Sequence, residues 1–220
     1  MSGAPPIGVI LDCDGVLVDS EGLASRVESE VLRDLGLDLT VDEAHEMFLG
    51  KTVAGVLETI EKRTGRVPTP GFTYNWAFAT AHAFLSELRP VPYVRVALEE
   101  LRRRGHPMVV ASQSPLARVR MSLEVAGLAE FFGDRICVTS MVARPKPAPD
   151  VYLLAAQRMQ RPAPACVVIE DSPAGAAAAF AAGMYSVLYA PGDHAATTGP
   201  GSLRLMRSMD ELPGIIATMH

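Results

Sequence analysis

Cysteine is scarce in this chain of 220 residues, and long hydrophobic runs are absent. The three cysteines, Cys13, Cys137 and Cys166, have no spacing typical of a metal site, and each lies in or beside an apolar run. We expect all three to be reduced residues of the core. Because no apolar stretch approaches the length needed to cross a bilayer, we expect no membrane-spanning helix.

Positive charge and aromatic residues are also limited. The formal net charge is -5, aromatic residues make up 6%, and no cluster of Lys and Arg interleaves with them, so we expect no nucleic-acid partner. Residues 1–6 contain no basic segment and precede only a short apolar run, which is unlike a signal peptide. We therefore expect a cytoplasmic protein that does not associate with membranes.

From Pro107 onward, short apolar runs alternate with helix-like segments, which is the pattern of a parallel sheet covered by helices. The pattern predicts five strands, one that ends at Asp12 and others at 107–111, 135–139, 166–170 and 185–189. Crossover helices are predicted at 115–126, 149–159 and 173–182. Each opens with a proline, which the first turn of a helix tolerates. The expected fold class is therefore α/β.

The segment from about residue 21 to residue 88 interrupts this alternation, because it has helical periodicity and no convincing strand. We expect it to form a small α-helical cap domain inserted after the first strand. The expected boundaries are 18–89 for the cap, and 1–17 together with 90–220 for the catalytic core.

The most informative motif is Asp12-Cys13-Asp14-Gly15, which directly follows the apolar run 7–11. Side chains alternate faces in an extended segment, so Asp12 and Asp14 are expected to project the same way. Two carboxylates this close need a divalent cation, a shared proton or a strong hydrogen-bond donor. The motif is also compatible with an ordinary solvated turn, since Asp and Gly are common turn residues.

Three more of the predicted strands end in polar residues. Ser112 and Gln113 follow the second strand, Lys146 lies between prolines after the third, and the pair Glu170-Asp171 ends the fourth. Taken singly, these are ordinary helix caps and a surface lysine. Ligands of open α/β sheets bind just beyond the carboxyl ends of strands. Together the four strand ends therefore predict a site for a divalent cation and a phosphate.

The ordered set of motifs resembles the haloacid dehalogenase-like superfamily of phosphohydrolases, in the branch with a helical cap that includes β-phosphoglucomutase. The resemblance implies a Rossmann-like parallel sheet flanked by helices, with the helical cap inserted. It also implies a Mg²⁺-dependent phosphoric monoester hydrolase that acts on a small phosphorylated metabolite, a sugar or sugar-acid phosphate. Residues 20–28 are similar to a subgroup that includes a 6-phosphogluconate phosphatase. We expect a monomer or a weak homodimer.

The resemblance also implies roles for individual residues. Asp12 would attack phosphorus and carry an aspartyl-phosphate, and Asp14 would protonate the leaving alcohol and then activate water. The further catalytic residues implied are Ser112 and Lys146, which would bind the phosphoryl oxygens. The implied Mg²⁺ ligands are Asp12, the backbone carbonyl of Asp14, and Asp171, with Glu170 in support. The implied substrate contacts are Gly15, Glu21, Gly50, Lys51, Thr52 and Gln113.

Two other functions stay open at this point. A phosphomutase is the first, but Ala24 stands where the branch often has a histidine, and Val53 stands where the mutase carries an arginine. Both departures favour a phosphatase. The second is a protein that binds a phosphorylated metabolite without turnover, although no residue of the four motifs is missing.

Overall fold

The computed structural model describes residues 6–48, 53–191 and 202–219. The chain divides into two compact units. The core unit comprises Met1–Val18 and Arg89–His220, and the helical unit comprises Asp19–Leu88. The helical unit thus interrupts the core unit after its first strand.

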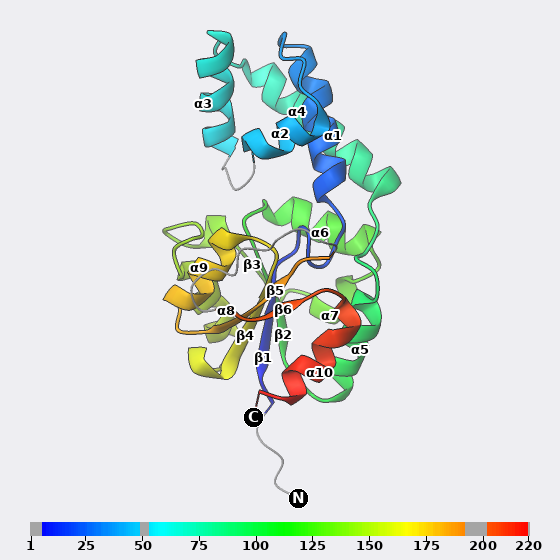
Figure 1. Ribbon diagram of the computed structural model, residues 1–220, viewed down its shortest axis with the longest axis vertical. Helices are drawn as coiled ribbons and strands as arrows, with labels where there is room; N and C mark the ends of the chain where they lie inside the picture. Colours follow the sequence, from blue (N-terminus) through cyan, green and yellow to red (C-terminus); the bar gives the residue numbers. More distant parts are fainter. Residues whose placement is uncertain (1–5, 49–52, 192–201, 220) are drawn as a thin grey trace, which may run out of the picture. The chain divides into compact units, whose positions relative to one another are not determined.

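The core unit is built on a six-stranded, all-parallel sheet with the order β3-β2-β1-β4-β5-β6 (Figure 1). In the centre of the sheet, Ile10 is in register with Val109 on one side and Val168 on the other, and all three are fully buried. Parallel strands with helices on both faces read as unbroken apolar runs, which is why they could be predicted. The strands are β1 (Gly8–Leu11), β2 (Met108–Ser112), β3 (Ile136–Val138), β4 (Cys166–Glu170), β5 (Tyr185–Tyr189) and β6 (Ser202–Met206).

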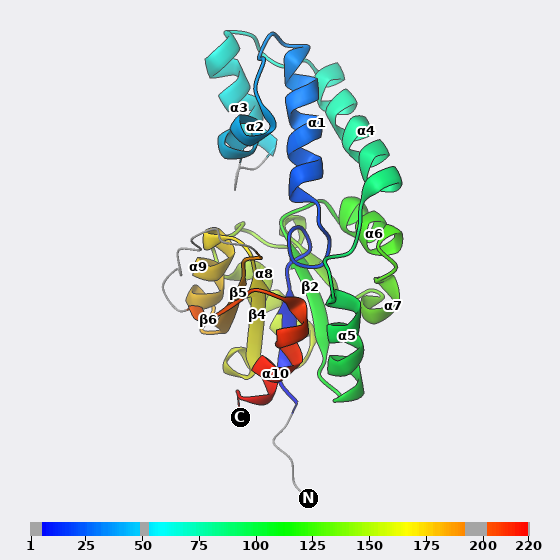
Figure 2. The same cartoon turned by 45° about the vertical axis from the view of Figure 1, so that its right-hand side comes forward.

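Helices cover both faces of this sheet (Figures 1 and 2). On one face, α8 packs on β1, β2 and β3, and α9 packs on β4 and β5. The helices of the other face include α5 and α10, which pack on each other. The predicted α/β fold class is confirmed. The α-helices of the core unit are α5 (Val94–Arg103), α6 (Leu116–Val125), α7 (Ala129–Phe132), α8 (Asp150–Arg158), α9 (Pro173–Ala181) and α10 (Leu212–Ala217).

The hydrophobic core under α8 and α9 contains two of the three cysteines. Cys137 and Cys166 pack there with Ile10, Val168 and a series of alanines from both helices. Together with Cys13 they are buried and free, as expected. Small alanine side chains allow α8 and α9 to approach the sheet closely. Because α8 follows β3 and α9 follows β4 in a parallel sheet, both helices begin near the carboxyl ends of the strands.

The beginnings of the crossover helices follow the predicted prolines. Helices α6 and α8 start directly after Pro115 and Pro149, and Pro173 is the first residue of α9. The Ser172 side chain caps α9 by accepting a hydrogen bond from the backbone N–H of Gly175. A proline at this position loses nothing, because the first N–H groups of a helix have no partner within the helix.

The structure contains one strand, β6, in addition to the five that the sequence pattern predicts. It pairs only with β5 at the edge of the sheet. Its sequence, Ser-Leu-Arg-Leu-Met, includes a polar first residue and an arginine at the third position. An edge strand does not need the continuous apolar run by which the buried strands were recognised.

The helical unit has its own hydrophobic core. Across the parts of residues 19–88 that the structure describes, the regular elements are the helices α1 (Glu21–Arg33), α2 (Val41–Phe48), α3 (Val53–Thr64) and α4 (Pro70–Glu87). Leu32 packs there with Met47 and Ile60, and Trp76 lies against this cluster. A groove of about 490 Å³ runs between α1 and α4, and the ion pair of Arg26 with Glu87 (2.7 Å) lines it.

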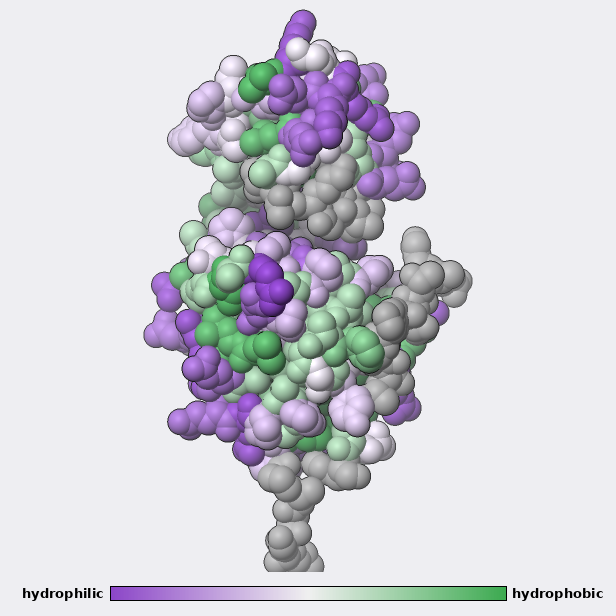
Figure 3. Space-filling view, turned by 90° about the vertical axis from the view of Figure 1, so that its left-hand side faces the viewer, coloured by the Kyte–Doolittle hydropathy of each residue, from purple (hydrophilic) through white to green (hydrophobic). Residues whose placement is uncertain are grey.

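The surface of the core unit mixes apolar and polar residues on the side that carries α8 and α9 (Figure 3). Leu153 on α8 and Phe180 on α9 are 44% and 58% exposed. Scattered apolar side chains of this kind are normal on soluble proteins. Among the described residues, no helix has both the length and the apolar character that a membrane span requires.

Candidate active site

Asp12 stands directly after β1, at the carboxyl edge of the sheet. Its backbone N–H donates to the carbonyl of Ile169 on β4 (3.0 Å), so the strand pairing continues to this residue and fixes its position. Its side chain is buried, and Oδ1 accepts a hydrogen bond from Lys146 Nζ at 2.6 Å. A buried carboxylate is costly unless it is paired, and Lys146 supplies the pairing.

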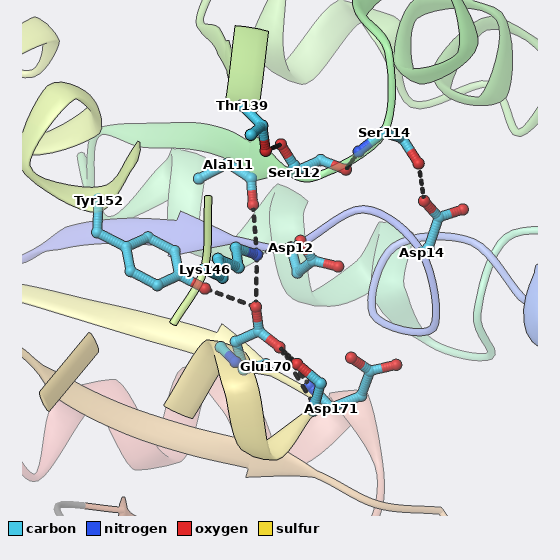
Figure 4. A network of polar contacts seen from close by, with 12 residues as sticks. Asp12, Asp14, Ala111, Ser112, Ser114, Thr139, Lys146, Tyr152, Glu170 and Asp171 are labelled. Carbon is cyan, nitrogen blue, oxygen red and sulfur yellow. Dashed lines mark hydrogen bonds and ion pairs between the residues drawn. The ribbon is translucent and has the colours of Figure 1, made fainter. Parts of the chain in front are cut away.

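Lys146 joins three acceptors at the centre of the site (Figure 4). Its Nζ donates to Asp12 Oδ1 (2.6 Å), to Glu170 Oε1 (2.6 Å) and to the carbonyl of Ala111 (3.0 Å), which uses all three of its protons. Burial alone would lower the pKa of Lys146. The charges of Asp12 and Glu170 outweigh burial and raise that pKa well above its ordinary value. Lys146 is therefore a fixed positive charge.

Glu170, the last residue of β4, is held on both of its carboxylate oxygens. Oε1 accepts from Lys146 and from the hydroxyl of Tyr152 (2.5 Å), a buried residue of α8. Oε2 accepts from the backbone N–H groups of Asp171 and Ser172 and from the Ser172 hydroxyl (2.8 Å). Burial alone would raise the pKa of Glu170, but Lys146 and these donors lower it. The carboxylate stays ionised and rigid.

Two glycines leave room for the acids of the fourth motif. A Cβ at Gly175 would lie 1.9 Å from the carboxyl carbon of Glu170, and one at Gly15 would lie 1.7 Å from Asp171 Oδ2. Gly15 also has a φ of +73°, which other residues rarely adopt. Gly15 was expected as a substrate contact. That role stays a prediction, and the structure shows that a glycine at this position leaves space for the carboxylate of Asp171.

Asp12, Glu170 and Asp171 form a group suited to a cation. One carboxylate oxygen of each lies within 4.8 Å of the others. Against these three negative charges the site holds the single positive charge of Lys146, so a divalent cation would balance it. Burial, together with the charge of Glu170, raises the pKa of Asp12 to about 7 in the metal-free protein despite the lowering effect of Lys146. The donor set therefore fits a divalent cation.

Asp14 lies apart from this carboxylate group. The strand ends at Leu11, and the chain then turns so that the N–H groups of Leu17 and Val18 both donate to the carbonyl of Cys13. The chain bends at Cys13, so the face alternation on which the expectation for Asp12 and Asp14 rested does not extend to Asp14. The carboxylate of Asp14 accepts from Ser114 Oγ at 2.6 Å and from Arg118 Nη2 at 3.1 Å.

Ser112 and Gln113 end β2 next to this network. Ser112 is buried, and its hydroxyl accepts a hydrogen bond from the backbone N–H of Ser114 at 3.0 Å. The Thr139 hydroxyl donates to the Ser112 carbonyl at 3.5 Å. Gln113 is exposed. The turn after β2 thus presents a hydroxyl and the start of α6 at the same edge of the sheet as Asp12.

The remaining predicted substrate contacts belong to the helical unit. Glu21 is the first residue of α1 and is exposed. Gly50, Lys51 and Thr52 lie outside the residues that the structure describes. Their role as substrate contacts stays a prediction.

Sequence reasoning missed three residues of the site, Ser114, Arg118 and Tyr152. Ser114 lies in the turn before α6 and Arg118 in the first turn of that helix, so no helical spacing relates the two. The sequence signal that could have found Ser114 is its place directly after the second motif. Tyr152 carries no comparable signal, because a tyrosine in an apolar helix reads as ordinary core.

Comparison with known proteins adds a family to this geometry. A family model described as a haloacid dehalogenase-like hydrolase matches residues 8–183. A fructose-1-phosphate phosphatase of Escherichia coli K12 is 32% identical over 180 residues, covering 82% of this chain and 94% of that protein. A 6-phosphogluconate phosphatase of the same organism is 27% identical over 177 residues, covering 80% and 79%.

Two further similarities differ in extent. The chloroplast protein SUPPRESSOR OF QUENCHING 1 of Arabidopsis thaliana is 32% identical over 180 residues, but the match spans only 17% of its length. The crystal structure of a haloacid dehalogenase family hydrolase from Deinococcus radiodurans R1, with bound phosphate and sodium, superposes with a TM-score of 0.79. It is 36% identical, and the match covers 99% of this chain and 97% of that one.

Proposed function

Because the chain belongs to the haloacid dehalogenase-like hydrolases, we propose that it is a Mg²⁺-dependent phosphatase that hydrolyses a small phosphorylated metabolite through an aspartyl-phosphate on Asp12. The resemblance drawn from the four motifs is confirmed at the level of the family, and the predicted class of phosphoric monoester hydrolase with it. The metal, the covalent intermediate and the substrate are the parts that we propose.

The observation that carries the proposal is the position of Lys146 between Asp12 and Glu170 at 2.6 Å from each. A lysine bound on all sides by the protein orients Asp12 and disfavours its protonation. It leaves the second oxygen of Asp12 to act as a nucleophile. Such an arrangement at the carboxyl edge of a parallel sheet suits covalent catalysis better than passive binding.

The reaction proceeds in two displacements at phosphorus. Asp12 forms a bond to phosphorus while the bond to the alcohol oxygen breaks, and Asp14 gives that oxygen a proton. Water then attacks phosphorus, loses a proton to Asp14 and releases inorganic phosphate, which restores Asp12. Ser112 would donate a hydrogen bond to a phosphoryl oxygen, and the fixed positive charge of Lys146 would attract the phosphoryl group. Each step uses a residue that lies at the same sheet edge.

Mg²⁺ would be held by Asp12 and Asp171, with the backbone carbonyl of Asp14. Glu170 would support the site without direct binding, because it already accepts five hydrogen bonds. The cation would supply positive charge that lowers the pKa of Asp12 and offsets the negative charge of the phosphoryl oxygens.

We propose a sugar phosphate or sugar-acid phosphate as the substrate. The printed activities of two relatives, on fructose 1-phosphate and on 6-phosphogluconate, support this class. The helical unit, residues 19–88, is inserted after the strand that carries Asp12, and we propose that it is a cap that selects the substrate.

Phosphate release from a panel of phosphorylated sugars and sugar acids, with and without Mg²⁺, tests the proposal. We expect turnover of at least one compound that a chelator abolishes and that Asp12→Asn reduces by at least about 1,000-fold. Glu99→Gln, which alters an exposed residue of α5, is the matched control and should keep full activity. Undiminished turnover by Asp12→Asn would overturn the proposal. Isomerisation of a sugar phosphate when a sugar bisphosphate is added would favour a mutase instead.

A further inference from the structure

We propose that Ser114 and Arg118 are positioning residues that hold the carboxylate of Asp14 toward the leaving group of the substrate. Ser114 lies in the turn before α6, and Arg118 lies in the first turn of that helix. The inference rests on the proposed function, in which Asp14 gives the departing alcohol its proton. It assigns the orientation of that proton donor to two residues that the four motifs do not include.

Both oxygens of Asp14 are bound by different side chains. Oδ2 accepts from the hydroxyl of Ser114 at 2.6 Å, and Oδ1 accepts from Arg118 Nη2 at 3.1 Å. One hydrogen bond would leave a carboxylate free to rotate, whereas two bonds at separate oxygens fix its plane as well as its position. The side chains of Arg118 and Asp14 are 31% and 26% exposed, so water only partly screens their attraction.

Asp14 lies beyond the end of β1, just before Gly15, whose φ is +73°. Its backbone makes one isolated bridge, with Val18, and is not part of the sheet. Hydrogen bonds to the side chain therefore matter more for its orientation than they would inside a strand. A proton donor acts only within hydrogen-bond reach of the oxygen that departs, and a small misplacement costs a large factor in rate.

The same turn also links Asp14 to Ser112, the residue proposed to bind the phosphoryl group. The backbone N–H of Ser114 donates to the hydroxyl of Ser112 at 3.0 Å. Figure 4 shows this chain of contacts from Thr139 through Ser112 and Ser114 to Asp14, separate from the network around Lys146. The two acids of the first motif thus have different hydrogen-bond partners.

A comparison of 4-nitrophenyl phosphate with phenyl phosphate, which lacks the nitro group and has the more basic leaving group, tests the inference. 4-Nitrophenolate leaves without a proton, whereas phenolate needs one, so only phenyl phosphate depends strongly on the proton donor. The values of kcat and KM with Mg²⁺ are measured for both esters with wild type, Ser114→Ala, Arg118→Met, and Asp14→Asn as reference. The value of kcat/KM reports the steps up to release of the aryl alcohol, which is the first displacement. The second displacement, hydrolysis of the phosphoryl group on Asp12, is the same for both esters.

We expect Ser114→Ala and Arg118→Met to lower kcat/KM for phenyl phosphate by about 10- to 100-fold, a share of the roughly 100- to 10,000-fold that general acid catalysis supplies. The loss for 4-nitrophenyl phosphate should be about 3-fold or less. The loss should appear in kcat rather than KM, and Ser114→Thr and Arg118→Lys should restore most of it. Arg120→Met is the control for Arg118→Met, because Arg120 is exposed on the same helix and pairs with Asp134.

An equal loss of kcat/KM for both esters would show a merely structural role and would overturn the inference, and so would unchanged kinetics of both variants. A failure of the proposed function has a different signature. In that case the wild-type protein releases phosphate from neither ester, or Asp12→Asn remains active.

Discussion

Replacing Lys146 by methionine should destabilise the protein by about 3–5 kcal/mol, the usual cost of leaving a buried charge without its partner. This is a large loss of unfolding free energy for a single side chain, and the surroundings of Lys146 explain it. Its side chain is 2% exposed, and its Nζ makes hydrogen bonds to Asp12, Glu170 and the carbonyl of Ala111. Methionine fills a similar volume, so the loss comes from the charge and the hydrogen bonds rather than from a cavity.

The effect of Lys146→Met should depend on pH and on metal. Without the lysine, burial and mutual repulsion raise the pKa values of Asp12 and Glu170, so the folded protein takes up protons and regains stability at lower pH. The loss should therefore be largest at about pH 8 and smaller at about pH 5. Mg²⁺ should recover part of it at either pH, because a bound cation replaces some of the missing positive charge.

Urea unfolding followed by circular dichroism measures the change. Lys62→Met is the matched control, because Lys62 pairs with Glu58 at the same distance of 2.6 Å but is 72% exposed. That variant should unfold at nearly the same urea midpoint as the wild type, because water screens an exposed ion pair. The double variant Lys146→Met/Glu170→Gln should be more stable than Lys146→Met alone, since it buries one uncompensated charge fewer. Equal midpoints for Lys146→Met and Lys62→Met would refute the reasoning.

Three further predictions concern other parts of the core unit. Gly175→Ala should abolish most phosphatase activity and lower the unfolding midpoint, because its Cβ would overlap the Glu170 carboxyl group. Gly214→Ala, whose Cβ meets nothing within 4 Å among the described residues, should leave activity unchanged, and equal behaviour of the two would contradict the prediction. Tyr93→Gly should raise the free energy of unfolding by about 1 kcal/mol, since Tyr93 has a left-handed φ of 65° at the start of α5 and is 61% exposed. Tyr93→Ala keeps the strain and should give no such gain, so a similar gain in both variants would exclude strain as the cause. In metal-free buffer, wild type should lose stability relative to Asp12→Asn as pH rises from about 4 to about 7, because burial raises the folded pKa of Asp12 to about 7 and the folded state binds the extra proton over that range. A pH-independent difference between the two proteins in urea titrations would refute this assignment.

The sequence predicts that the motif residues meet at the carboxyl edge of the sheet, because the order of parallel strands brings them there. Asp12 directly follows the apolar strand β1, and Glu170 is the last residue of the apolar strand β4. Parallel strands place their carboxyl ends at the same edge of the sheet. Lys146 is far from both in the chain, yet its Nζ lies 2.6 Å from each carboxylate. Topology alone is enough to predict that these three residues approach one another.

Side-chain partners could not be predicted in the same way. Whether Asp14 faces Asp12 or α6 depends on where β1 ends and on the turn that follows, and neither follows from face alternation. In the sequence, Tyr152 looks like an ordinary core residue, and nothing there indicates that its hydroxyl donates to Glu170. Such partners depend on rotamers that packing from distant segments selects. Edge strand β6 was missed because it lacks the apolar run of a buried strand.

Detection of a phosphoryl group on Asp12 tests the proposed chemistry most directly. The Asp14→Asn variant, which should be slow to activate water, is mixed with 4-nitrophenyl phosphate and Mg²⁺, quenched in acid within milliseconds, and mapped by peptide mass spectrometry. The peptide that contains Asp12 should gain the mass of one phosphoryl group, and the gain should be absent without Mg²⁺ and in Asp12→Asn. Steady phosphate release with no phosphoryl group on that peptide, or with the group on another residue, would contradict covalent catalysis by Asp12.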